Sequence, residues 1–168
     1  ATGSGGTGPN MANSGSYYAY LESSNPVAAG DSAILMSPPI NTAMLTDAPA
    51  LYFDYHMFGN DAMTLKVEYE VFGSDIWETV WEQVGQSHPS PAAPYAMAYI
   101  PLPNAAGSII RVRFVAVAGE DSPGSTLASL SDIAIDDVRI QNVLANDVAV
   151  TNIITPENDC SLGVQPVT

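Results

Sequence analysis

The chain has 168 residues, of which 46% are hydrophobic, enough for one domain with a substantial core and too apolar for general disorder. Four Lys and Arg residues face 18 Asp and Glu residues, giving a formal net charge of −14. Such a charge disfavours binding to nucleic acid or to an anionic membrane surface. No apolar run approaches the roughly 20 residues that cross a bilayer, so we expect no membrane insertion.

Residues 1–16 are rich in Gly, Ser, Thr and Asn, which predicts a flexible lead-in. Strands are predicted next at 17–23, 33–37 and 51–58. Residues 63–71 alternate between apolar and polar side chains, as in a half-buried antiparallel strand. The polar side of that strand, including Glu68 and Glu70, is expected to face solvent.

Residues 76–84 fit both helical spacing and strand alternation, and the strands around them favour a strand. Further strands are predicted at 96–102 and 108–118, and a last one at 131–140. Strands that recur every ten to fifteen residues between turns predict an all-β fold, an antiparallel β-sandwich covering residues 17–141.

The last strand contains Asp132, Asp136 and Asp137 within an apolar run. Asp is depleted from strands, and a buried carboxylate is costly without a partner. Adjacent side chains on a strand point to opposite faces, so Asp136 and Asp137 are not expected to act as one catalytic pair. Two alternatives remain open: a calcium site, or backbone amides for Asp136 and an arginine, such as Arg139 or Arg111, for Asp137.

Catalytic motifs are missing from the sequence. Neither His56 nor His88 has the spacing of a zinc site or of a nucleophile–base pair. Glu68 and Glu70 share a face, but one expected to be solvated, where a glycosidase pair would not lie. We therefore expect a non-enzymatic domain. Trp77 and Trp81 are expected to be packing residues, with a sugar-binding platform as the alternative.

From residue 142 the chain changes character. The pattern of residues 147–154 predicts a separate strand. We therefore expect 142–168 to be a linker and the start of a truncated following domain. This segment is loosely similar to an immunoglobulin-like module. The single cysteine, Cys160, cannot form an internal disulfide, and its expected partner would lie in a longer chain.

Five short motifs occur in an order that resembles a known family. They are Gly8-Pro9 with 15–23, then 31–38, 51–59, 65–67 and 132–138. Over residues 7–141 the chain resembles a MAM domain, the extracellular module named after meprin, A5 antigen and receptor tyrosine phosphatase mu. The resemblance implies a jelly-roll sandwich of two antiparallel sheets with an adhesion or recognition role. It also implies that His56 is packed among aromatic side chains.

The resemblance further suggests one structural Ca²⁺, with Glu22, Asp31, Asp136 and Asp137 as ligands. The family's paired cysteines are absent from the matching region, as expected of a bacterial version, and so is its first strand. The sheet edge that this strand would cover should be open, filled by residues 147–154, or occupied by another chain.

The function expected from these observations is a non-catalytic adhesion or recognition module of a secreted or cell-surface multidomain bacterial protein. Its partner would be a protein or glycan at a cell surface, or a neighbouring domain or chain. The alternative is a carbohydrate-binding module that targets an attached enzyme to polysaccharide, with Trp77 or Trp81 against the sugar.

Overall fold

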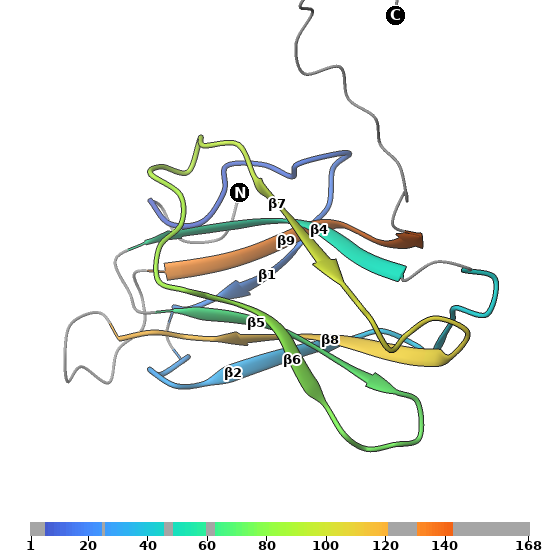
Figure 1. The fold of residues 1–168 in the computed structure, drawn as a ribbon. Coiled ribbons are helices and arrows are strands. Elements are labelled where there is room, and N and C mark those ends of the chain that lie inside the picture. The colour runs from blue at the N-terminus through green and yellow to red at the C-terminus, as the bar shows by residue number, and fades with distance from the viewer. Residues whose placement is uncertain (1–5, 25, 46–48, 60–62, 121–130, 143–168) are drawn as a thin grey trace, which may run out of the picture.

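Two antiparallel sheets pack face to face in the computed structural model, which describes residues 6–24, 26–45, 49–59, 63–120 and 131–142 (Figure 1). These residues form strands and connecting turns, without a helix. Accordingly, the described part of the chain contains no helix that could cross a membrane. The predicted all-β sandwich is confirmed.

The upper sheet in Figure 1 has the strand order β1-β9-β4-β7. Its strands are β1 (Ala19–Glu22), β9 (Ser131–Asn142), β4 (Pro49–Gly59) and β7 (Ala96–Pro101). The lower sheet has the order β2-β8-β5-β6, and a short β3 also pairs with β8. Its strands are β2 (Ser32–Met36), β3 (Ile40–Asn41), β5 (Thr64–Val71), β6 (Glu78–Val84) and β8 (Ile109–Val117).

Each strand that was predicted within the described residues appears, and residues 78–84 of the ambiguous segment 76–84 form β6. Only β3, two residues long, has no counterpart in the sequence-based prediction. It follows Pro38-Pro39, where a strand was expected to stop. The predicted strand at 147–154 lies outside the described residues.

The core lies between the sheets and follows the strand alternation. Phe53 of β4 packs edge-on against Phe114 of β8 and Trp81 of β6, with ring centroids 5.0 and 5.3 Å apart. Each large apolar side chain buried in this way stabilises the fold by about 1.5–3 kcal/mol. The other fully buried members come from both sheets, and include Leu51, Met57, Met63, Leu65, Val67, Leu102 and Ile110.

The outer face of β5 is only partly solvated: the Lys66 side chain is exposed as expected, but Glu68 and Glu70 are covered. The register sets Glu70 opposite Arg111 and Glu68 opposite Arg113, and each pair forms an ion pair. The Glu70 side chain is 0% exposed. The prediction was wrong because alternation shows which side chains share a face but not which side chains of a neighbouring strand cover that face.

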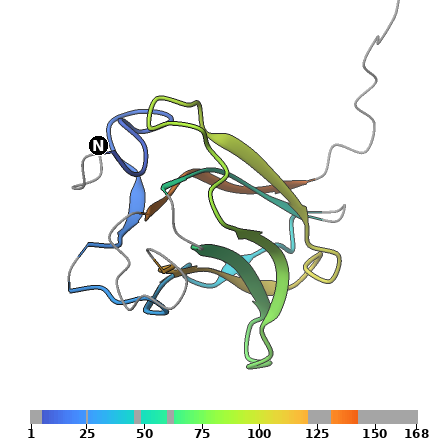
Figure 2. The same ribbon diagram turned by 90° about the vertical axis from the view of Figure 1, so that its left-hand side faces the viewer.

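Two loops cover part of the outer face of the upper sheet (Figures 1 and 2). One is 6–16, from the segment expected to be a flexible lead-in, and the other is 85–95. The Gly8 amide donates to the Phe58 carbonyl over 3.1 Å and the Asn10 amide to the Pro91 carbonyl over 2.9 Å. Thr7 is buried. These long-range bonds hold residues 7–10 against β4 and the second loop.

Candidate functional site

A β-bulge in β9 shapes the outer face of the upper sheet. The register between β4 and β9 shifts between Tyr52 and Asp54, and Asp137 has a φ of 50°. An extra residue in one strand bends that strand and redirects its side chains. Asp136 and Asp137 consequently contact the same two residues, Asn13 and Ser14. The prediction that these carboxylates point to opposite faces is therefore wrong.

The turn at Asn13-Ser14 donates hydrogen bonds to three carboxylates. Its two backbone amides donate to Oδ2 of Asp136, over 2.9 and 3.1 Å. Asn13 Nδ2 donates to Oδ2 of Asp137 over 2.9 Å and to Oδ2 of Asp54 over 3.1 Å. Ser14 Oγ donates to Oδ1 of Asp137 over 2.5 Å. This turn therefore joins the N-terminal loop to β4 and β9.

Asp137 and Asp54 have pKa values that are shifted in opposite directions. Hydrogen bonds from Ser14 and then Asn13 lower the pKa of Asp137. Burial raises the pKa of Asp54, and the negative charge of Asp137 raises it further. Ionisation is therefore disfavoured at Asp54, which lies close to the negative charge of Asp137.

Aromatic side chains lie beside these carboxylates. The rings of Tyr52 and Tyr99 are 5.1 Å apart, and the Arg139 guanidinium lies 5.1 Å from the Tyr52 ring centroid. Met97 follows on the same face of β7, with its sulfur 3.8 Å from an Arg139 nitrogen. Tyr99 is 46% and Met97 61% exposed.

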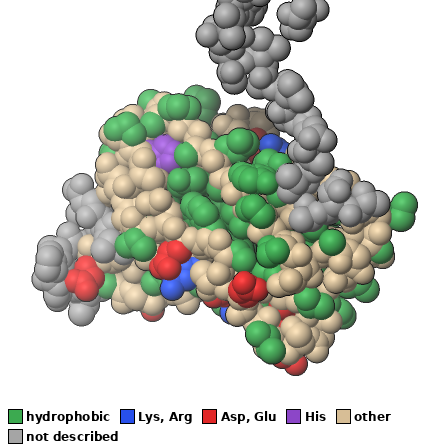
Figure 3. All heavy atoms as spheres, viewed as in Figure 1, with side chains coloured by type: hydrophobic (Ala, Val, Ile, Leu, Met, Phe, Trp, Pro, Cys, Tyr) green, Lys and Arg blue, Asp and Glu red, His purple; other side chains and the backbone are tan. Residues whose placement is uncertain are grey.

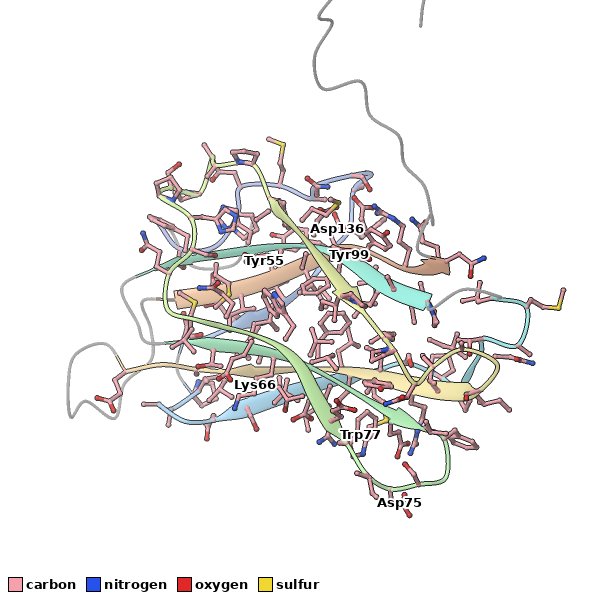
Figure 4. All side chains as sticks on the ribbon, in the orientation of Figure 1. Tyr55, Lys66, Asp75, Trp77, Tyr99 and Asp136 are labelled. Atoms are coloured by element: carbon pink, nitrogen blue, oxygen red, sulfur yellow. The ribbon has the colours of Figure 1, made fainter. Side chains whose placement is uncertain are left out.

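We call this surface the tyrosine–carboxylate patch; Figure 4 shows Tyr99 and Asp136 on the upper sheet. Its members are Tyr52, Asp54, Met97, Tyr99, Asp136, Asp137 and Arg139. The sequence pattern singled out Asp136, Asp137 and Arg139, but not Asp54, Met97 or the two tyrosines. Its tyrosines come from β4 and β7, more than 40 positions apart in the chain, so no local pattern brings them together.

The structure does not bring together the four residues expected to bind calcium. Glu22 lies opposite Asp132 in the β1–β9 register, four positions along β9 from Asp136, which is about 13 Å at strand spacing. Asp31 precedes β2 in the lower sheet, and its carboxylate accepts from the Ala28 amide over 2.8 Å. Among the described residues, no three or more His, Cys, Asp or Glu side chains form a group that could hold a metal ion.

Asp132 is a buried carboxylate that the sequence-based reasoning did not select as a site residue. Its oxygens accept from Thr7 Oγ1 over 3.0 Å and from the Ser23 amide over 3.3 Å. The only signal in the sequence was its place at the start of the Asp-containing strand. It fastens the N-terminal loop and the end of β1 to β9.

The two tryptophans lie on different sides of the lower sheet. Trp81 packs in the sandwich against Phe53 and Tyr55, with centroids 5.3 and 5.1 Å away. Trp77 is half-buried on the outer face, where the Arg113 guanidinium lies 4.1 Å from its ring centroid. Figure 4 shows Trp77 near the β5–β6 turn, far from Tyr99. Trp81 thus serves packing, and Trp77 covers the Arg–Glu pairs.

The two histidines join loop 85–95 to the upper sheet. Their rings stack 4.2 Å apart and both are buried. The Met57 amide donates to His88 Nδ1 over 3.1 Å, and His56 Nε2 lies 3.2 Å from the Ser90 carbonyl oxygen. Burial, followed by the neighbouring His88, lowers the pKa of His56 to about 4. His56 is packed among rings, as expected.

One comparison with known families gives a match. The family model described as MAM domain, meprin/A5/mu, matches residues 2–144. This range contains the nine strands of the described residues, the Asn13-Ser14 turn and the whole tyrosine–carboxylate patch.

Proposed function

The chain belongs to the MAM family, and on that basis we propose that it is a recognition module of a secreted or cell-surface multidomain bacterial protein. MAM domains are non-catalytic, adhesion-type modules. The observation that carries the proposal is the family match over residues 2–144, together with the two-sheet sandwich. The proposed location is extracellular or at the cell surface, and the proposed partner is a protein or glycan there.

The tyrosine–carboxylate patch is the surface we propose for recognition. Tyr and Arg are enriched among the residues that dominate binding energy at protein interfaces. Tyr99 and Met97 offer exposed apolar area, and Asp54 and Asp137 offer acceptors beside it. With a chain charge of −14, this surface suits a partner that presents hydrogen-bond donors or positive charge.

A carbohydrate-binding module is the second candidate, favoured by one observation. The Tyr52–Tyr99 pair sets an exposed aromatic surface directly beside carboxylates. Aromatic rings can stack on sugar rings while carboxylates accept from sugar hydroxyls. On this reading the module would bring an attached enzyme to polysaccharide.

Binding experiments separate the two candidates. The purified chain is tested on a glycan array, on insoluble polysaccharides, and on beads coated with the chain itself or with bacterial surface proteins. We expect Tyr99→Ala to weaken binding at least tenfold with an unchanged melting temperature. Met44→Ala, which removes another exposed side chain in the segment between β3 and β4, outside the patch, should bind normally.

The outcomes are distinct. Binding to protein-coated beads supports the adhesion module, and binding to glycans alone supports the carbohydrate-binding module. Binding to neither, or equal binding by the Tyr99→Ala variant, would reject the patch as the recognition surface.

Calcium remains a proposal, and the geometry limits where it could bind. Two groups of neighbouring carboxylates are the places to test: Glu22 with Asp132, and Asp136 with Asp137. Neither holds three acidic side chains that could bind an ion by themselves, so backbone and water oxygens would have to complete the coordination. Saturation at a hundred times Kd would stabilise the folded state by about 2.7 kcal/mol. A calcium-dependent rise in melting temperature that Asp132→Asn abolishes would place the ion at the first group, and one that Asp136→Asn abolishes at the second. No shift with calcium or chelator would reject the metal.

A further inference from the structure

The stacked histidines lie where β4 meets loop 85–95. His56 comes from β4 and His88 from the loop, and their side chains are 0% and 4% exposed. Tyr55 lies 5.7 Å from His88 and Tyr95 lies 5.4 Å from His56, measured between ring centroids. Two imidazoles are therefore enclosed among aromatic rings, although histidine is the side chain that most readily takes up a proton in mild acid.

Hydrogen bonds fix which nitrogen of each ring carries the hydrogen. A backbone amide can only donate, so Nδ1 of His88, which accepts from the Met57 amide over 3.1 Å, carries none. A carbonyl oxygen can only accept, so Nε2 of His56 donates to the Ser90 carbonyl over 3.2 Å. Nδ1 of His56 is then the bare nitrogen, and it is buried without a hydrogen-bond partner among the described residues.

A further proton has no suitable place on either ring. On His88 it would set an N–H against the Met57 N–H, which would lose its acceptor even if the Ser87 hydroxyl, 2.9 Å away, accepted the new hydrogen. On His56 it would set a charged N–H in a buried position with no acceptor, which is costly. Proton uptake and the packed arrangement of the two rings therefore exclude each other.

The surroundings provide no charge that would offset a proton. Loops 6–16 and 85–95 contain no Asp, Glu, Lys or Arg. Strand β9 places Ala134 opposite His56. Among the described residues, neither ring has a carboxylate as a hydrogen-bond partner, and the titratable neighbours are tyrosines. Asp136 of β9 and Tyr18 act on Tyr95, the next ring outward.

The same contacts attach loop 85–95 to β4. The Met57 carbonyl accepts from the amides of Ser87 and His88, each over 3.0 Å. The Gly59 amide donates to Oε1 of Gln86 over 3.3 Å. Because His88 accepts from Met57 on the same stretch, displacing its ring removes the centre of this attachment.

Loop 85–95 in turn supports loop 6–16, and Figures 1 and 2 show the two loops side by side above the upper sheet. The Asn10 amide donates to the Pro91 carbonyl over 2.9 Å, and the Tyr95 hydroxyl donates to the Met11 carbonyl over 3.2 Å. Loop 6–16 carries the Asn13-Ser14 turn, which binds the carboxylates of the tyrosine–carboxylate patch. A continuous set of contacts thus joins the histidines to the patch.

We propose that the His56–His88 pair is a pH-sensitive switch: proton uptake frees loop 85–95 from β4 and, through loop 6–16, releases the Asn13-Ser14 turn from the patch. The backbone pairing of β4 with β9 involves neither imidazole, so the release is confined to the loops. Its effect on recognition rests on the proposed function of the patch, whereas the release itself does not.

Proton linkage sets the direction and size of the effect. Burial, followed by the neighbouring His88, lowers the pKa of His56 to about 4 in the closed arrangement, against its usual 6.5 when exposed. The open form therefore binds more protons, and acid favours opening. Between pH 7 and pH 5, His56 alone shifts this equilibrium roughly twentyfold. His88, whose pKa is also lowered by burial, adds to the shift.

The test is hydrogen exchange of the 168-residue chain at pH 7 and pH 5, expressed as protection factors that correct for the intrinsic pH dependence of exchange. We expect the protection of the Met57, Asn10 and Asn13 amides to fall at least tenfold at pH 5. The slowest amides of β5 should keep theirs. In the same samples, an NMR titration should place the midpoints of both imidazoles below the usual pKa of 6.5.

Two variants identify the responsible group. His56→Phe keeps a ring in the stack but takes up no proton, and should reduce the fall to a few-fold. Asp54→Asn removes a nearby carboxylate whose pKa is raised by burial, and should leave the fall at Met57 and Asn10 intact. The imidazole midpoints of the unmodified chain decide the same question if His56→Phe does not fold.

Protection of the Met57 and Asn10 amides that is unchanged at pH 5 would overturn the switch, as would an undiminished fall in His56→Phe or an imidazole midpoint at 6.5 or above. An equal loss in β5 would show general acid unfolding in place of a local release. A fall at Met57 without one at Asn13 would reject the link to the patch. These measurements use no ligand, so they can fail while the Tyr99→Ala binding test succeeds, and the reverse.

Discussion

Asp54 and Asp137 have oppositely shifted pKa values, although both accept from Asn13. Asp137 has two donors, Ser14 and Asn13, which stabilise its ionised form. Asp54 is partly buried and lies beside two other carboxylates, so ionisation costs it free energy. Neutral pH therefore leaves one unfavourable negative charge on this surface.

Replacing that charge should stabilise the protein. We predict that Asp54→Asn raises the melting temperature at pH 7, since an amide oxygen can still accept from Asn13 and the repulsion from Asp137 is removed. A raised folded-state pKa means that the native state holds its proton more readily than the unfolded state. The stabilisation relative to the unmodified protein should therefore vanish as the pH falls and Asp54 becomes neutral in both.

Asp75→Asn is the control for this variant. Asp75 lies in the exposed turn between β5 and β6 with a φ of 55°, a conformation that Asn tolerates well (Figure 4). The Asp75→Asn variant lowers the net negative charge by the same amount as Asp54→Asn but leaves the tyrosine–carboxylate patch unchanged. If both variants raised the melting temperature equally, the gain would come from net charge and not from the patch.

The histidine pair predicts a loss of stability in mild acid. The unfolded state binds protons near the usual pKa of 6.5, whereas the pKa of His56 in the fold is lowered to about 4 and that of His88 is also lowered. A lowered folded-state pKa means that the unfolded state gains more protons, so the free energy of unfolding falls as the pH drops from about 6.5 toward 4.

His56→Phe tests this prediction. The aromatic ring keeps much of the packing against His88 and Tyr95 but cannot be protonated. Its melting temperature at pH 7 should be lower, because the contact to the Ser90 carbonyl is lost. Its decline between pH 6.5 and 4 should be shallower than that of the unmodified protein. If the melting temperatures of the two proteins fell in parallel as the pH was lowered, the acid sensitivity would not come from His56.

At the scale of the elements, the β5–β8 pairing depends on a buried charge. Glu70 is fully buried and pairs with Arg111, whose guanidinium also lies 5.0 Å from the Phe72 ring centroid. Removing one partner of such a pair leaves an uncompensated charge in the protein. The contribution of the Glu70–Arg111 pair to stability is therefore measured by removing one of its two partners.

We predict that Arg111→Ala destabilises the fold by about 3 kcal/mol. The double variant Glu70→Leu with Arg111→Met should recover most of this loss, because no charge is then buried. Both are measured by urea unfolding at pH 7.

Lys66→Ala is the matched control, removing the exposed partner of Glu82 on the same sheet, where the ions are 3.5 Å apart (Figure 4). It should cost at most about 1 kcal/mol. Equal losses for Arg111→Ala and Lys66→Ala would show that burial of Glu70 does not decide the effect.

At the scale of the whole molecule, the net charge of −14 opposes compactness. Figure 3 shows that the face in view also carries a broad hydrophobic area with acidic and basic groups scattered around it. Of the four basic residues, Lys66, Arg111 and Arg113 are already paired with Glu82, Glu70 and Glu68. Most acidic side chains therefore repel one another through solvent.

Salt should stabilise such a molecule. We predict that raising NaCl from about 0.05 to 0.5 M increases the melting temperature by a few degrees, since the screening length falls from above 10 Å to only a few ångström. KCl should act alike, with chelator present throughout. An unchanged or lower melting temperature would show that the surface ion pairs outweigh the repulsion.

The sequence by itself determined the strands and the inward-facing side chains. The alternation in 63–71 predicted β5, with Leu65, Val67 and Tyr69 facing the core, because side-chain direction in a strand repeats every two residues. The regular succession of short strands and turns predicted the antiparallel sandwich, because strand alternation and turn residues are local features of the sequence. The five motifs then indicated the MAM family that the comparison confirmed.

Only the tertiary structure decided the partners of the charged and polar groups. Asn13 meets Asp136 and Asp137 across more than 120 positions of sequence, and Glu70 meets Arg111 across 41. The β9 bulge, which turns Asp137 toward Asn13, appears only once β9 is aligned with β4. Such contacts depend on strand register, and register follows from the packing of both sheets together, so no local pattern in the sequence could reveal them.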